Sequence, residues 1–67
     1  MKNKIKVERA KKNLTQAELA KKVGVSRQTV NSIESAKYVP STVLALKLSE
    51  VFQVAVNQLF ELDENDK

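Results

Sequence analysis

The sequence of 67 residues contains no cysteine and no histidine, and it has only one glycine and one proline. Without cysteine there are no disulfides, and without either residue the usual zinc clusters are excluded. No histidine or cysteine is present to activate a nucleophile, and a single glycine cannot form a glycine-rich phosphate loop. We therefore expect a protein that is not an enzyme and that binds no metal or cofactor.

Long hydrophobic runs are also missing. The longest run, residues 43–46 (VLAL), has four residues, far fewer than a membrane-spanning helix needs. The lysines among residues 2–6 resemble the start of a signal peptide, but no apolar stretch follows them. We therefore predict one domain over residues 1–67 with a cytoplasmic location.

The net charge of +4 is unevenly distributed. Residues 1–40 carry ten basic and three acidic side chains, whereas residues 41–67 carry two basic and five acidic ones. A cationic N-terminal portion suits a protein that faces a polyanion with one side. Taken alone, the pattern fits a surface with lysines scattered for solubility equally well.

Residues 15–33, TQAELAKKVGVSRQTVNSI, have the pattern of two short helices joined by a sharp turn. Thr15 can cap the first helix, and Glu18 can complete a capping box with it. Ser26 can cap the second helix. Gly24 lies between the helices and can adopt the positive φ that a tight turn requires. The pattern predicts a helix-turn-helix.

The second of these helices, residues 26–35, has polar side chains that suit contact with the bases of double-stranded DNA. The residues assigned to base contact are Arg27, Gln28, Thr29, Asn31 and Ser32. The amide of Gln28 can pair bidentately with adenine, and Arg27 can bind guanine in the same way or contact a phosphate. The alternative is an ordinary polar helix face. We favour a DNA-binding motif over residues 15–35, with its second helix in the major groove.

The chain resembles a known family in this region and beyond it. Five residues stand at the spacing of the helix-turn-helix in lambdoid phage repressors and Xre-type bacterial regulators. They are Gln16, Ala20, Gly24, Val30 and Ile33. Residues 33–60 and 5–14 are similar to the rest of a small stand-alone Xre-type regulator. The resemblance implies an all-α fold, a compact five-helix bundle of the lambda-repressor type, and a transcriptional regulator.

Outside the motif we expect helices over residues 3–12, with Asn3 as the cap, over 42–52 and over 56–60, and we expect residues 63–67 to be frayed. The resembled family usually has a left-handed glycine at the positions of Ala36 and Gln53. Some of its members add short strands from the two chain ends. Here these strands would be residues 1–4 beside residues 60–63.

The resemblance also assigns residues outside the second motif helix. Gln16 corresponds to a glutamine that contacts the DNA backbone in the phage repressors. From their position just past the motif, Lys37 and Tyr38 are assigned to the DNA backbone, and the alternatives are a solvated lysine and a half-buried tyrosine. Ser26, the cap of the second helix, is assigned to the backbone as well. Two further residues, Arg9 and Glu34, correspond to an internal ion pair in those repressors.

One such helix reads only a few base pairs, too few to find an operator in a genome. Two copies on a two-fold axis would read half-sites about 34 Å apart. The C-terminal residues 54–62 supply more apolar surface than a short last helix needs. The dimer interface is therefore assigned to Val54, Val56, Leu59, Phe60 and Leu62. The alternative is that these residues close the core of one chain, as Leu59 and Phe60 do in part.

These patterns predict a homodimeric transcriptional regulator that binds a palindromic operator in double-stranded DNA, and the resemblance implies that it is a repressor. The alternative is an antitoxin-like protein-interaction module that also binds its own promoter and uses its acidic C-terminal portion to hold a protein partner. A DNA-binding protein without sequence preference is disfavoured by the bidentate capacity of Gln28.

Overall fold

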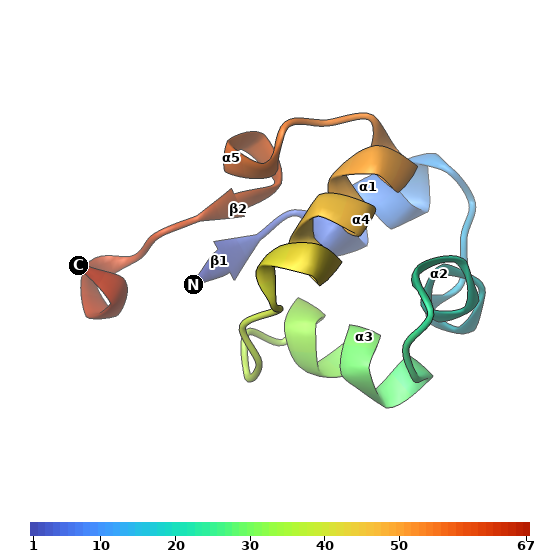
Figure 1. Cartoon of the computed structure of the whole chain (residues 1–67), viewed down its shortest axis with the longest axis horizontal. Helices are drawn as coiled ribbons and strands as arrows, with labels where there is room; N and C mark the ends of the chain where they lie inside the picture. Colours follow the sequence, from blue (N-terminus) through green and yellow to red (C-terminus); the bar gives the residue numbers. More distant parts are fainter.

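The computed structural model describes all residues, Met1–Lys67, and confirms a five-helix fold with a small antiparallel sheet (Figure 1). The helices are α1 (Ile5–Lys11), α2 (Gln16–Val23), α3 (Arg27–Glu34), α4 (Thr42–Phe52) and α5 (Val56–Leu59). The strands are β1 (Lys2–Asn3) and β2 (Phe60–Glu61), and a 3-10 turn, η1, covers Glu64–Asp66. Both termini lie at one end of the long axis in Figure 1, and α2 lies at the other end.

The helices begin where the sequence supplies a side-chain cap. The hydroxyl of Thr15 accepts the backbone N–H of Glu18 at 3.0 Å, and the Glu18 carboxylate accepts the backbone N–H of Thr15 at 2.9 Å. These hydrogen bonds form the predicted capping box and lower the pKa of Glu18. The hydroxyls of Ser26 and Ser41 cap α3 and α4 in the same way, each accepting a backbone N–H three residues later. The starts of these three helices are therefore fixed by local hydrogen bonds.

Left-handed backbone conformations follow four of the helical segments. Gly24 has φ 75°, whereas Asn13, Ala36 and Gln53 have φ 55°, 61° and 54° without being glycine. Ala36 and Gln53 are left-handed at the two positions where the resembled family usually has glycine, and Asn13 adds a third such residue that was not predicted. Each non-glycine residue in this region carries a backbone cost of about 1–2 kcal/mol.

Replacing Ala36 with glycine should therefore stabilise the protein. Relief of the left-handed strain exceeds the extra chain entropy of glycine, for a net gain of about 0.5–1 kcal/mol in the free energy of unfolding. The melting temperature of a domain of this size should rise by about 2–8 °C. Ala10→Gly, on the exposed side of helix α1, is the matched control and should lower it. A melting temperature that falls in Ala36→Gly would contradict this account.

The two chain ends pair as short strands, as expected. Lys2 lies opposite Glu61, and Asn3 lies opposite Phe60. This pairing corrects the predicted start of the first helix, because Asn3 is held in an extended strand and α1 begins at Ile5. The Asn3 side chain still accepts the N–H of Ile5 at 3.1 Å, and its amino group donates to the carbonyl of Ile33 at 2.7 Å. Asn3 therefore ties the terminal sheet to the end of α3.

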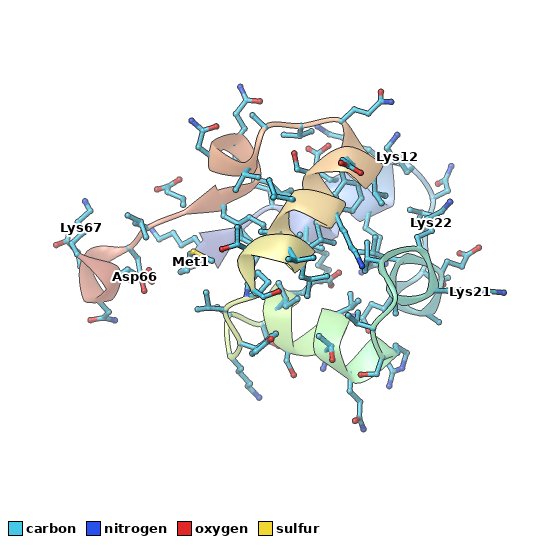
Figure 2. The ribbon with its side chains drawn as sticks, viewed as in Figure 1. Met1, Lys12, Lys21, Lys22, Asp66 and Lys67 are labelled. Atoms are coloured by element: carbon cyan, nitrogen blue, oxygen red, sulfur yellow. The ribbon has the colours of Figure 1, made fainter.

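The C-terminal residues 63–67, expected to be frayed, form an ordered turn in the structure. Asp63 caps η1 through a reciprocal pair of hydrogen bonds with Asp66. The amino group of Met1 lies 3.2 Å from the carboxylate of Asp63 and 3.1 Å from that of Asp66. Met1 and Asp66 are labelled at the same end of the molecule in Figure 2.

All five helices contribute to one hydrophobic core. Its buried side chains are Ile5, Leu19, Ala20, Val23, Val30, Ile33, Leu44, Leu48, Phe52, Leu59 and Phe60. Ala20 is small, which lets α3 approach α2 closely. None of the helices combines the length and the hydrophobicity that a membrane crossing requires.

Candidate nucleic-acid interface

Helices α2 and α3 pack against each other and are joined by a tight turn at Gly24. The N–H of Gly24 donates to the carbonyl of Ala20, and so does the N–H of Val25. A Cβ atom at residue 24 would meet no other atom within 4 Å. Glycine is therefore needed here for its positive φ and not for space. The turn fixes the angle at which α3 leaves α2.

The helix α3 divides into a buried edge and an exposed edge. Val30 and Ile33 are 1% and 2% exposed and face the core. Arg27, Gln28 and Asn31 are exposed on the opposite edge. The helix therefore presents only polar side chains to solvent.

A shallow hollow joins residues of α3 to the loop that follows it. It is lined by Ser26, Gln28, Thr29, Ser32 and Tyr38. Thr29 and Ser32 are half-buried, and the hydroxyl of Thr29 is hydrogen-bonded to that of Ser26 at 2.9 Å. Thr29 therefore supports the N-terminus of α3 as well as facing the hollow. Tyr38 and Lys37 are exposed in the loop at the other end of α3.

Arg9 and Glu34 form an ion pair that joins α1 to α3. The Arg9 Nε and Nη2 atoms donate to the two carboxylate oxygens of Glu34 at 2.8 and 3.1 Å, and Nη1 donates to the carbonyl of Leu14 at 2.9 Å. The Arg9 and Glu34 side chains are 17% and 6% exposed. Burial acts to raise the pKa of Glu34, but the hydrogen bonds from Arg9 and Gln16 outweigh it and the pKa lies below its ordinary value.

Gln16 lies between this ion pair and the exposed edge of α3. Its Nε2 atom donates to Oε1 of Glu34 at 3.1 Å and to Oδ1 of Asn31 at 3.2 Å. Its Oε1 atom accepts from Nη1 of Arg27 at 3.2 Å. These contacts connect two residues assigned to base contact with the interior of the domain. Sequence reasoning missed them because the partners lie 11 to 18 residues apart in the chain.

The charge on α3 is carried by Arg27 alone, because the only acidic side chain of the helix, Glu34, is neutralised by Arg9. Three other basic residues, Lys12, Lys21 and Lys22, extend from the α1–α2 end of the molecule in Figure 2. In this view α3 lies along the lower edge of the molecule, apart from these lysines. The exposed edge of α3 is therefore weakly cationic and rich in hydrogen-bonding groups.

The residues assigned to a dimer interface do not form one exposed surface. Leu59 and Phe60 are 1% and 8% exposed and belong to the core of the chain, while Val54 and Val56 are half-buried against that core. Leu62 is 58% exposed. Leu59 of α5 and Phe60 of β2 turn inward and close the core of one chain, as the alternative reading of these residues held, and their part in a dimer stays a prediction.

An apolar groove near the chain termini was not predicted. It is lined by Met1, Val39, Pro40, Thr42, Ala45, Leu46, Val56 and Phe60. Val39 and Leu46 are 57% and 52% exposed, although both are large apolar residues. Leu46 lies outside the Leu44–Leu48–Phe52 stripe of α4, and this mismatch is the sequence signal that could have indicated it.

A capped helix packed across another through a left-handed glycine, with a polar outer edge, defines a helix-turn-helix protein. Comparison with known families agrees, because residues 5–59 match the sequence profile of the helix-turn-helix family. The chain belongs to the Xre-type branch of this family.

Similar proteins occur in archaea, bacteria and phage. An uncharacterized HTH-type transcriptional regulator of Methanocaldococcus jannaschii is 50% identical over 66 residues, which cover 98% of this chain and 100% of the relative. The HTH-type regulator YgzD of Bacillus subtilis is 46% identical, with 98% and 100% covered. The ImmF control region 10 kDa protein of Bacillus phage phi105 is 36% identical over 82% of this chain and 61% of its own length.

Proposed function

We propose that the protein is a sequence-specific repressor of transcription that inserts α3 into the major groove of a palindromic operator. The observation that carries this proposal is the exposed polar edge of α3, formed by Arg27, Gln28 and Asn31 and held rigidly by α2. An α-helix fits the major groove, and its N-terminal residues lie nearest the bases in this motif. The relatives described as transcriptional regulators support a role in the regulation of transcription.

Base contact is assigned to the exposed and half-exposed side chains of α3. Gln28 is the main adenine reader, because its amide offers a donor and an acceptor and has no hydrogen bond within the chain. Thr29 and Ser32 face the hollow beside Gln28 and extend the reading surface. Ser26, Lys37 and Tyr38 flank the ends of α3, where they would bind the two backbones that border the groove.

Replacing Gln28 with alanine tests the base-reading role. Loss of a bidentate contact should cost about 1–3 kcal/mol of discrimination, so preference should disappear at one base pair in each half-site. Selection of bound fragments from a random DNA pool measures this directly. Gln58→Ala, an exposed glutamine on α5 away from the motif, is the matched control and should leave the selected sequence unchanged. Equal affinity of the wild-type protein for selected and random DNA would overturn the repressor proposal.

The dimer is proposed to form through the apolar groove, together with the exposed side chain of Leu62. Val39 and Leu46 are both more than half exposed and line the same groove, so they form a shared apolar surface and are not isolated exposed residues. A two-fold interface places the same patch on both copies, so one apolar patch can bury itself against its equivalent. Met1, which lines the groove, lies on the side of the molecule opposite to Lys21 and Lys22 of α2 (Figure 2).

The shape of the molecule agrees with this placement. The domain is 32 Å long and 20–22 Å across. The spacing of about 34 Å between half-sites is therefore comparable to the length of one domain.

The antitoxin-like alternative requires an acidic C-terminal surface that is free to bind a protein. Asp63 and Asp66 instead form ion pairs with the amino group of Met1. The side chain of each aspartate also accepts the backbone N–H of the other. This arrangement favours the repressor, because part of the acidic charge is already compensated inside the domain.

A further inference from the structure

The orientation of the Gln16 amide is fixed by chemistry at both ends of its hydrogen-bond network. The carboxylate of Glu34 can only accept, so the atom of Gln16 that faces it at 3.1 Å must be the donor Nε2. The guanidinium of Arg27 can only donate, so the atom that faces it at 3.2 Å must be the acceptor Oε1. Both ends of the network therefore require the same orientation of the amide.

This orientation determines which end of Asn31 is available to DNA. The second hydrogen of Gln16 Nε2 points to Asn31, and the facing atom of Asn31 at 3.2 Å must be its acceptor Oδ1. The oxygen of the Asn31 amide is therefore turned toward α2. Its Nδ2 amino group lies on the other side of the planar amide and has no hydrogen-bond partner in the chain.

Both hydrogens of the Gln16 amide are used within the domain. Gln16 would have to release Asn31 or Glu34 before it could donate to a phosphate. The phosphate contact that the resemblance assigns to this residue is therefore disfavoured by the hydrogen bonds present in the domain. Gln16 is instead well placed to act through its neighbours.

We propose that Glu34 and Gln16 position Asn31 as a donor-only reader, so that Asn31 selects guanine and not adenine at its base pair. This inference rests on the proposed DNA binding by α3. Guanine presents two acceptors, O6 and N7, in the major groove, which one amino group can bind as the ammonium of lysine does. Adenine presents one acceptor and one donor, and an amide reads it well only when its oxygen is free.

Gln16→Ala and Gln16→Leu test the proposal, because both remove the hydrogen bond to Asn31, and leucine also retains most of the side-chain volume. Fragments selected from a random DNA pool are compared for the wild type, both variants and Asn31→Ala, which identifies the base pair that Asn31 reads. The wild type should select guanine there. In the Gln16 variants the ratio of guanine to adenine should fall by roughly tenfold, because the freed amide can turn. If the alanine variant does not fold, the leucine variant provides the same comparison.

Arg9→Lys is the matched control for a general effect of the ion pair. It alters the partner of Glu34 but leaves the carboxylate as the acceptor for Gln16. Guanine should therefore still be selected in this variant. Unchanged preference at the Asn31 base pair in both folded Gln16 variants, or adenine at that base pair in the wild type, would overturn the proposal. A wild-type protein that selects no sequence at all would instead overturn the proposed function.

Discussion

Replacing Glu34 with alanine should lower the free energy of unfolding by about 3–5 kcal/mol, the range for removing one partner of a buried ion pair. Arg9 would keep its hydrogen bond to Leu14 but would lose both bonds to the carboxylate while only 17% exposed. The loss should lie near the lower end of that range, because some water reaches Arg9. A domain of this size has a total free energy of unfolding of only about 3–10 kcal/mol. The substitution would therefore remove a large part of the stability of the folded state.

Denaturant titration of the wild type and the variant measures this effect. Glu50→Ala, an exposed glutamate on α4, is the matched control and should change stability by less than about 0.5 kcal/mol. The combined change Arg9→Met and Glu34→Leu should recover much of the loss, because no charge is left unpaired. An unchanged denaturation midpoint in Glu34→Ala would show that the ion pair contributes little.

The pH dependence of the same pair has a definite sign. The pKa of Glu34 lies below the ordinary value of 4.5 in the folded protein, so its contribution to stability is present above that value. It is lost as the pH falls below 4.5 and through the lower pKa of the folded state. Glu34→Ala should therefore lose less stability than the wild type on acidification over this interval.

The helix starts could be predicted from sequence because their causes are local. A cap joins residues three apart, as Thr15 and Glu18 or Ser26 and Thr29 do, and the residue types alone identify it. The resemblance to a family marked the positions of Ala36 and Gln53 but did not say what conformation a residue other than glycine adopts there; both are left-handed. Asn3 was misjudged because its conformation is set by pairing with Phe60, a contact across almost the whole chain.

The site was predicted less completely, for two physical reasons. The exposed edge of α3 follows from helical periodicity, but the connection from Glu34 through Gln16 to Asn31 depends on how α2 crosses α3. The apolar C-terminal residues raised a different problem. Burial in the core of one chain and burial against a second copy require the same kinds of side chain, so composition alone could not separate Leu59, which lies in the core, from Leu46, which is exposed and belongs to the proposed dimer contact.

Replacing Leu46 with glutamate should separate the proposed dimer while leaving the fold of each domain intact. Leu46 is 52% exposed on α4, so the change removes little contact from the core of one chain. In a two-fold interface the variant brings two carboxylates into an apolar groove, where an unpaired charge is strongly disfavoured. The proposed partner contacts would be lost on both copies at once.

Sedimentation should show a monomer for Leu46→Glu at concentrations where the wild type is a dimer. Affinity for a palindromic operator should fall by about 100-fold or more, because the two half-sites would be bound independently. Affinity for a single half-site should change little, which distinguishes loss of the dimer from damage to α3. Val7→Glu, at an equally exposed valine on α1, is the matched control and should leave the dimer intact. If Leu46→Glu remains a dimer with full operator affinity, the two-fold contact must lie on another surface, because no interface that buries this side chain would accept the charge.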